Sequence, residues 1–221
     1  MNDPELSSIE SARPARRAAL KGAAWSAPVI AMAITAPLVA ASVNNASLAQ
    51  TDTETDLLSL RLLDGGGGLL TAQALVTVPT ELTLSNGSGA ISGETATITI
   101  AVGRPGGINI PTGTVRGFGV ASFDGVNSTE AERTFEYRRT GLLNVPYGAP
   151  TTTFSRVITV DVDSNGNLVI PVEFGLAGTS TSIVSVSLLA SYPVTYTLAF
   201  ASGASYSASG TISVPVGAGI L

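Results

Sequence analysis

This chain of 221 residues contains no cysteine and no histidine, and lysine and tryptophan occur once each, as Lys21 and Trp25. Without cysteine the chain cannot form a disulfide, an iron–sulfur cluster or a lipoprotein acyl anchor. Without histidine it lacks the base of Ser–His–Asp and Cys–His nucleophilic catalysis, and zinc sites with His or Cys ligands are excluded as well. Only carboxylate chemistry is left.

A basic segment followed by an apolar one lies near the start of the chain. Arg16 and Arg17 are followed by Leu20 and Lys21, and Gly22–Ala41 carries no charge. A basic region, an apolar region and a small-residue exit are typical of a secretory signal. The arginine pair with Leu20 and Lys21 resembles the motif of the twin-arginine translocation route, although alanine replaces the usual Ser/Thr before it and Phe after it. The whole leader is similar to those of small surface proteins of high-GC Gram-positive bacteria (actinobacteria), which implies export machinery as a partner.

Two fates of this signal segment are open. Gly22–Ala41 is long enough, at about 1.5 Å per residue, to cross a membrane, so it could remain as a signal anchor. Its alanine-rich composition and internal prolines weaken insertion. We predict cleavage between Ala41 and Ser42, with a second candidate site after Ala49. Contact with the membrane is then expected only through the signal segment.

The remainder of the chain is weakly charged and acidic. Seven arginines and thirteen acidic residues follow Ala41, which gives a formal net charge of −6. This balance offers no basic patch for nucleic acid. Because Lys21 leaves with the leader, Schiff-base chemistry is excluded, as is the Lys–Asn isopeptide crosslink found in some Gram-positive pilins. We expect no cofactor.

Apolar residues alternate with small polar ones through most of the chain after residue 42. In Thr95–Val102 the even-numbered residues are apolar and three of the odd-numbered ones are threonine. Such alternation is typical of half-buried strands. About ten such runs without a helix predict an all-β fold, an antiparallel immunoglobulin-like β-sandwich. The expected organisation is a helical signal segment over 1–41, a short linker over 42–56 and the β-sandwich domain over 57–221.

The clearest local signal is Asp161-Val-Asp-Ser-Asn-Gly-Asn167, which separates two runs rich in Val and Ile. Asn165-Gly166 predicts a hairpin because both residues tolerate positive φ at low cost. The stretch resembles the central hairpin of bacterial immunoglobulin-like repeat domains. It also fits the start of a calcium loop, but Val172 occupies the position of the bidentate Glu and the flanks are strands. We therefore predict a plain turn without a metal.

One segment combines several carboxylates with arginines. A pair of carboxylates is what a glycosidase requires, but a saccharide cleft without tryptophan would be unusual. Ion pairs across a solvent-facing strand explain the same residues better. The residues are Asp124, Glu130, Glu132, Glu136, Arg133, Arg138 and Arg139.

Towards the C-terminus, apolar residues keep one parity from Val184 to Phe200, which is longer than an ordinary strand. We predict a turn near Ser191–Pro193. Tyr196, Leu198 and Phe200 are then expected in the core, with Thr195 and Thr197 facing water. The uncharged terminal strand, Thr211–Val216, is predicted at or near a sheet edge, where it could pair with a neighbouring molecule.

These features favour a secreted or cell-surface protein that is not an enzyme. A structural or self-associating immunoglobulin-like subunit is the first hypothesis, with itself, another surface protein or a glycan as partner. An extracellular carbohydrate- or protein-binding (adhesion) module is the second, since sandwiches carry recognition on their end loops. A carboxylate-dependent hydrolase is the third.

Overall fold

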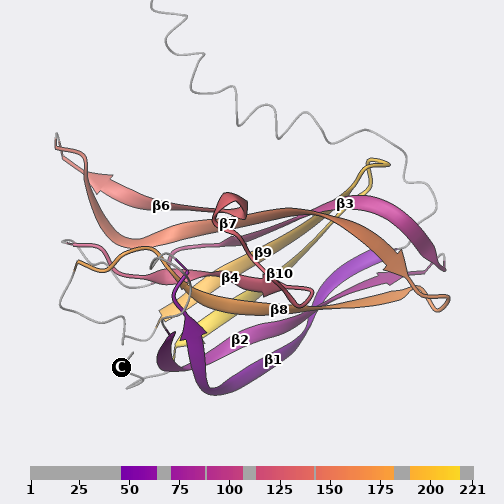
Figure 1. Ribbon diagram of the computed structural model, residues 1–221, viewed down its shortest axis with the longest axis horizontal. Coiled ribbons are helices and arrows are strands. Elements are labelled where there is room, and N and C mark those ends of the chain that lie inside the picture. Colours follow the sequence, from indigo (N-terminus) through magenta and orange to yellow (C-terminus); the bar gives the residue numbers. More distant parts are fainter. Residues whose placement is uncertain are drawn as a thin grey trace, which may run out of the picture. The chain divides into compact units, whose positions relative to one another are not determined.

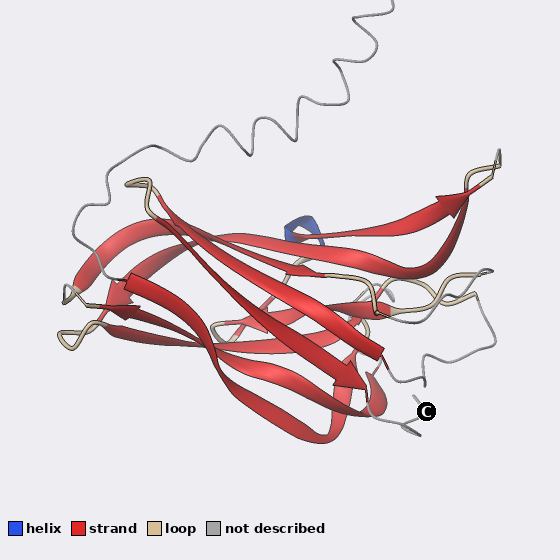
Figure 2. Ribbon diagram, turned by 180° about the vertical axis from the view of Figure 1, so that it is seen from behind, coloured by secondary structure: helices blue, strands red, loops and turns tan. Residues whose placement is uncertain are grey.

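The computed structural model describes residues 46–63, 71–87, 89–106, 113–141, 143–181 and 190–214. Within these ranges the fold is all-β, with antiparallel ladders and one short 3₁₀ turn, as Figures 1 and 2 show. The expected export residues Arg16, Arg17, Leu20 and Lys21 and the Ala41–Ser42 cleavage site lie outside the described residues. The strands are β1 (Ala46–Arg61), β2 (Thr71–Asn86), β3 (Ile91–Val102), β4 (Gly117–Phe123), β5 (Val126–Asn127), β6 (Arg133–Thr140), β7 (Val145–Val162), β8 (Asn167–Ala177), β9 (Ala190–Phe200) and β10 (Ser205–Val214), with the 3₁₀ turn η1 at Glu130–Glu132.

Side-chain alternation produces these strands, as the sequence predicts. In β3, Ala96, Ile98, Ile100 and Val102 are all buried, whereas Thr95 is exposed. The strands follow the order β5-β4-β8-β2-β10-β9-β3-β7-β6, with β1 paired to β2. The predicted antiparallel all-β fold of about ten strands is confirmed.

The sheet curls into two facing layers because β2 has different neighbours at its two ends. Glu81–Ser85 pair with β8, whereas Thr77 pairs with Ser213 of β10. β1 follows β2 along its length, and the register shifts at Asp52. Irregularities of this kind bend strands, so the β1–β2 pair passes from one layer to the other. The apolar residues of both inner faces form the core, as in a β-sandwich.

The aromatic stripe on β9 lies in this core. Tyr196, Leu198 and Phe200 are buried, Thr195 is exposed and Thr197 is half-buried. The predicted parity of this strand is therefore confirmed. Tyr192 is also fully buried, and its ring meets that of Phe118 edge-on at 4.9 Å between centroids.

The turn predicted near Ser191–Pro193 is wrong, because β9 runs straight through these residues. Pro193 lies opposite Thr211 of β10, and its carbonyl accepts a hydrogen bond of 2.7 Å from the Gly103 N–H. Gly103 follows the last residue of β3. The ladder between β3 and β9 therefore ends beside Pro193, which has no N–H to donate. A proline is tolerated in a strand at such a position.

The terminal strand is near a sheet edge rather than at one, because its contact with β2 is the single pair Ser213–Thr77. β10 lies between β9 and β2 in the strand order, and its residues pair with β9 along its whole length. Residues 215–221 lie outside the described residues. The strands with a single paired neighbour at the limits of the described sheet are β1, β5 and β6.

The expected linker over 42–56 is corrected as well, because β1 begins at Ala46. Ala46–Gln50 pair with Leu82–Asn86 of β2, and the Leu48 side chain is buried in the core. The threonines and acidic residues that follow are exposed, which explains why the sequence pattern indicates a linker there. Thr51 and Thr55 nevertheless form cross-strand hydroxyl pairs with Thr83 and Thr77.

The predicted turn at Asp163–Asn167 is present, but its two flanking strands separate. Gly166 donates its N–H to the Asp163 carbonyl at 2.9 Å, and the Asn167 N–H bonds the Asp163 carboxylate at 2.9 Å. Beyond the turn, β7 pairs with β3 and β6, whereas β8 pairs with β2 and β4. The turn therefore connects the two layers instead of closing a paired hairpin. Among the non-glycine residues of the described ranges, positive φ occurs at Asp124 and Asn144, not at Asn165.

Gly166→Ala is expected to lower the free energy of unfolding by about 2–4 kcal/mol, because two costs coincide. Gly166 has φ +79°, where a side chain is strained, and an added Cβ would clash with the Asn86 carbonyl oxygen. Chemical denaturation measures the change. Asn165→Ala is the matched control, with an expected loss well under 1 kcal/mol. An equal loss in the two variants would contradict the assigned turn geometry.

Candidate functional site

The carboxylates that the sequence offers as catalytic candidates do not converge. Asp124 lies in the turn after β4, Glu130 and Glu132 belong to η1, and Glu136 is exposed on β6. Among the described residues, no three acidic side chains are grouped closely enough to hold a metal ion. The Asp161 carboxylate accepts the Gly93 N–H at 2.7 Å, so it serves to tie β7 to β3.

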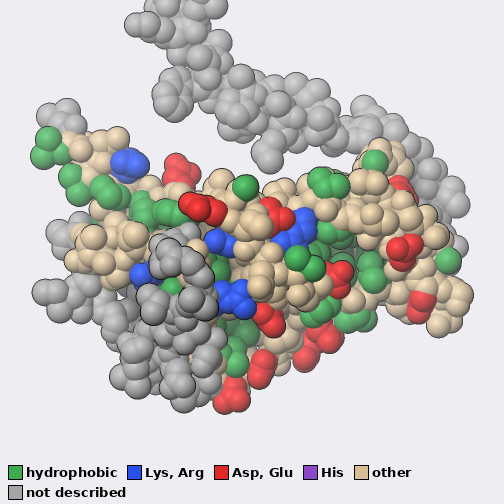
Figure 3. Space-filling model, viewed as in Figure 1, with side chains coloured by type: hydrophobic (Ala, Val, Ile, Leu, Met, Phe, Trp, Pro, Cys, Tyr) green, Lys and Arg blue, Asp and Glu red, His purple; other side chains and the backbone are tan. Residues whose placement is uncertain are grey.

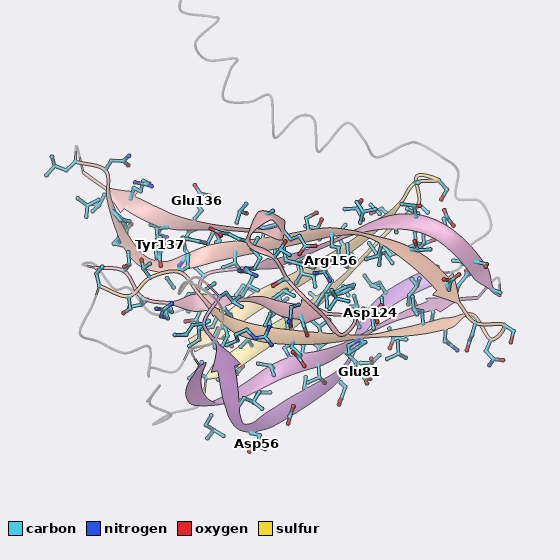
Figure 4. The ribbon with its side chains drawn as sticks, viewed as in Figure 1. Asp56, Glu81, Asp124, Glu136, Tyr137 and Arg156 are labelled. Atoms are coloured by element: carbon cyan, nitrogen blue, oxygen red, sulfur yellow. The ribbon has the colours of Figure 1, made fainter. Side chains whose placement is uncertain are left out.

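Arg156 is the most connected charged side chain of this region (Figure 4). Its guanidinium holds the Glu132 carboxylate through two hydrogen bonds, of 2.7 Å from Nε and 3.0 Å from Nη2. It also donates to the backbone carbonyls of Phe123, Val126 and Asn127 at 2.9–3.2 Å. The guanidinium carbon lies 5.1 Å from the ring centroid of Phe154. Arg156 thereby joins β7 of one layer to the β4–β5 segment of the other.

This ion pair changes the titration of both groups. The hydrogen bonds from Arg156 lower the pKa of Glu132 from its ordinary value of 4.5 to about 2, with smaller support from Thr129. The same contact raises the pKa of Arg156. The Arg156 and Glu132 side chains are only 13% and 23% exposed. A carboxylate held ionised this firmly is a poor general acid.

Two further arginines hold the same loop. Arg133 donates to the Ser128 carbonyl and hydroxyl at 2.8 and 2.7 Å and to the Leu63 carbonyl at 2.9 Å. Arg61 donates to the Asn127 side-chain oxygen at 2.7 Å. We name Arg61, Arg133 and Arg156 the arginine clasp. The expected ion pairs with Arg133, Arg138 and Arg139 are corrected: among the described residues, the ion pair of this segment joins Glu132 to Arg156 on β7.

A cleft of about 260 Å³ opens where β1, β2 and β8 separate. β8 pairs with β2 as far as Pro171 and meets the end of β1 again at Leu176, opposite Leu62. Between Pro171 and Leu176, the edge of β8 that faces β1 and β2 forms no strand pairing in the described structure. The lining combines buried apolar side chains with polar and charged ones, among them exposed Glu54 and Glu173. The lining consists of Glu54, Leu58, Leu60, Arg61, Val78, Thr80, Ala121, Val172, Glu173 and Phe174.

The second conspicuous surface is the end of the β6–β7 hairpin, which we name the arm (residues 135–141 and 143–147). β3 pairs with β7 only from Thr152 onward, so the arm extends past the neighbouring ladder. Figure 3 shows apolar side chains gathered at this end, with cationic side chains beside them. Phe135, Leu143 and Val145 are 44%, 87% and 47% exposed. Leu143 and Val145 lie together near the tip, whereas Phe135 lies further along β6, opposite Thr152. Exposed apolar side chains gathered in this way mark interaction surfaces.

Tyr137 fixes the base of the arm to the other layer. Its hydroxyl donates to the Thr179 carbonyl at 2.9 Å and accepts the Thr179 N–H at 2.8 Å. Its ring lies edge-on to Phe135, with the centroids 6.1 Å apart. The arm is therefore held at a defined angle to the domain (Figure 4).

No protein-family model and no curated protein matches this chain. Within the described ranges we find no helix with the length and hydropathy of a membrane span.

Proposed function

We propose that this is a secreted, non-enzymatic cell-surface protein that works as a structural, self-associating subunit of immunoglobulin-like type. The observation that carries the proposal is the arm, a rigidly based hairpin that exposes Leu143 and Val145 to solvent. A protein that works alone gains nothing from an apolar protrusion, which risks aggregation. The role of Glu132 as an ion-pair partner of Arg156 further supports a non-catalytic function for the acidic segment.

A second candidate function is an extracellular binding module for a glycan or another surface protein. The cleft beside β8 favours it, since a concave site that combines apolar side chains with a few polar groups is typical of ligand sites. The two candidates differ in what occupies the cleft. Binding of a foreign ligand by a monomeric protein would favour this alternative.

Export by the twin-arginine route is part of the proposal, with cleavage between Ala41 and Ser42. Burial of Leu48 in the core supports this site over the one after Ala49, because the later cut would remove Leu48 from the domain. Cleavage at Ala41 leaves all of β1 in the mature protein.

Replacing Arg16 and Arg17 together by lysine is expected to leave unprocessed precursor inside the cell. The twin-arginine receptor requires the guanidinium pair, and lysine is not equivalent to arginine at sites that read its planar fork. Immunoblots of cell, wall and medium fractions measure the effect, with Arg13→Lys as the control. Normal secretion of the double variant would contradict this route. Recovery of the wild-type protein from the cytoplasm alone would contradict the proposed surface function.

A further inference from the structure

The arm and the cleft are complementary in shape and in charge. The arm presents exposed Leu143 and Val145 near its tip, and the lining of the cleft includes the apolar side chains of Leu58, Val172 and Phe174 beside polar ones. A dry apolar cavity of about 150 Å³ is enough for a small hydrocarbon, so the 260 Å³ cleft has room for an aliphatic side chain of the size of Leu143.

The charges beside these apolar surfaces are opposite. Arg138 and Arg139 are exposed on the arm, where they outnumber its one exposed carboxylate, Glu136. The cleft has Glu54 and Glu173 in its lining, and Asp52 lies beside it, where its carboxylate accepts the Thr80 hydroxyl at 3.0 Å. Arg61, the basic residue of the lining, already donates to Asn127. The cleft therefore offers carboxylates to a cation that enters from outside.

We propose that the arm of one copy inserts into the cleft of a second copy, so that the protein assembles head to tail. This inference rests on the proposed function and names the partner surfaces within it. Leu143 enters the cleft beside the apolar residues of its lining, while Arg138 meets Glu54 and Glu173. Desolvation of the apolar contact supplies affinity, and the charges set orientation.

The positions of the two surfaces determine how such a contact propagates. In Figure 1 the arm is at the end of β6 and β7, across the domain from β1, which borders the cleft. The contact joins two different surfaces, so each added copy presents a free arm and a free cleft. Contacts of this heterologous kind produce rings or open filaments instead of closed two-fold dimers.

The test uses two variants of the exported protein, isolated after its own processing. The arm variant carries Arg138→Glu and Leu143→Asp, and the cleft variant carries Glu54→Lys and Glu173→Lys. All four side chains are exposed, so the fold should be retained, which far-UV circular dichroism verifies. Glu130→Lys on η1 is the control, since it changes the charge by the same kind of substitution at an exposed site outside the arm and the cleft.

Sedimentation velocity is expected to show concentration-dependent oligomers for the wild type and the control, and monomers for each variant alone. A mixture of the two variants retains one good arm and one good cleft. It should therefore form a one-to-one dimer and nothing larger, with affinity within about threefold of the wild-type contact. If the cleft variant does not fold, Leu143→Asp alone, at the arm tip, should still abolish assembly.

Several outcomes would overturn the inference. These are a wild-type protein that stays monomeric at millimolar concentration, variants that assemble like the wild type, or a mixture that stays monomeric or forms long oligomers. Loss of assembly in the Glu130→Lys control would also overturn it, because the effect would then be one of overall charge. Oligomers of the wild type that neither variant changes would contradict only this inference, whereas a monomeric wild type would also contradict the self-association in the proposed function. The fractionation experiment tests the surface location separately.

Discussion

Replacing Arg156 by alanine is expected to lower the free energy of unfolding by about 3–5 kcal/mol. The substitution leaves the Glu132 carboxylate without its partner and removes the hydrogen bonds to the carbonyls of Phe123, Val126 and Asn127. Removing one member of a largely buried ion pair costs this much because the remaining charge is left uncompensated. It also removes the guanidinium from the Phe154 ring. Urea unfolding followed by circular dichroism measures the loss.

The pH dependence of stability gives a second readout of the same contact. The pKa of Glu132 is about 2 in the folded protein and near 4.5 when unfolded. Between these values the unfolded chain binds a proton that the folded protein does not, so stability decreases as the pH falls from about 4.5 to 2. This one group contributes about 2–3 kcal/mol of the decrease. The contribution should be much smaller in Arg156→Ala, where only the hydrogen bonds from Thr129 still favour the ionised carboxylate.

Arg138→Ala is the matched control, because Arg138 is exposed on the same pair of strands as Arg156. Its expected effect on stability is a few tenths of a kcal/mol. Arg156→Lys should lie between the two, since lysine keeps the charge but cannot reproduce the planar fork. A loss below about 1 kcal/mol in Arg156→Ala would contradict the assigned role of the arginine clasp.

The local structure of this domain follows from its sequence, because side-chain alternation is a property of neighbouring residues. The buried positions of β3 and β9 are those of the apolar parity. Pairing between distant strands is not encoded locally. The uncharged segment at Thr211–Val214 reads as an edge strand, yet β9 pairs with it and β2 touches it at Ser213.

The wrong predictions at Pro193 and in the expected linker have the same origin. When its neighbours are unknown, a proline such as Pro193 predicts the end of a strand. In the fold, β3 ends opposite Pro193, so no ladder hydrogen bond from a backbone N–H is required there. The exposed Thr51–Asp56 has a linker composition, although β2 pairs with it along most of its length. In both cases the deciding partner is more than 20 residues away in sequence.

Arg156 is the residue that a closer inspection of parity could identify. It has the same parity as Phe154, Ile158 and Val160, which puts a charge on the inward face of β7. A charge in such a position requires a partner. The sequence does not reveal that the partner is Glu132, because η1 belongs to a different segment and reaches Arg156 only after the two layers have come together.

Phe200→Ala is expected to lower the free energy of unfolding by about 3–5 kcal/mol, through the cavity left in the core. Phe200 is buried near the end of β9, opposite Ala96 of β3. Its ring lies edge-on to Tyr206 of β10, with the centroids 5.9 Å apart. The side chain therefore connects three strands of one layer, and the neighbouring backbone is held by ladders on both sides. Little collapse into the cavity is expected, which places the cost toward the upper part of the range.

Thr195→Ala is the matched control on the same strand, because Thr195 has the opposite parity and is exposed. Its expected cost is a few tenths of a kcal/mol. Both variants can be compared with the wild type by thermal and urea unfolding, and the denaturant slope should stay the same in all three proteins. Equal losses at the two positions would mean that the aromatic face of β9 is not the inner face. The inner-face contact of Tyr192 with Phe118 across the two layers would then have to be abandoned as well.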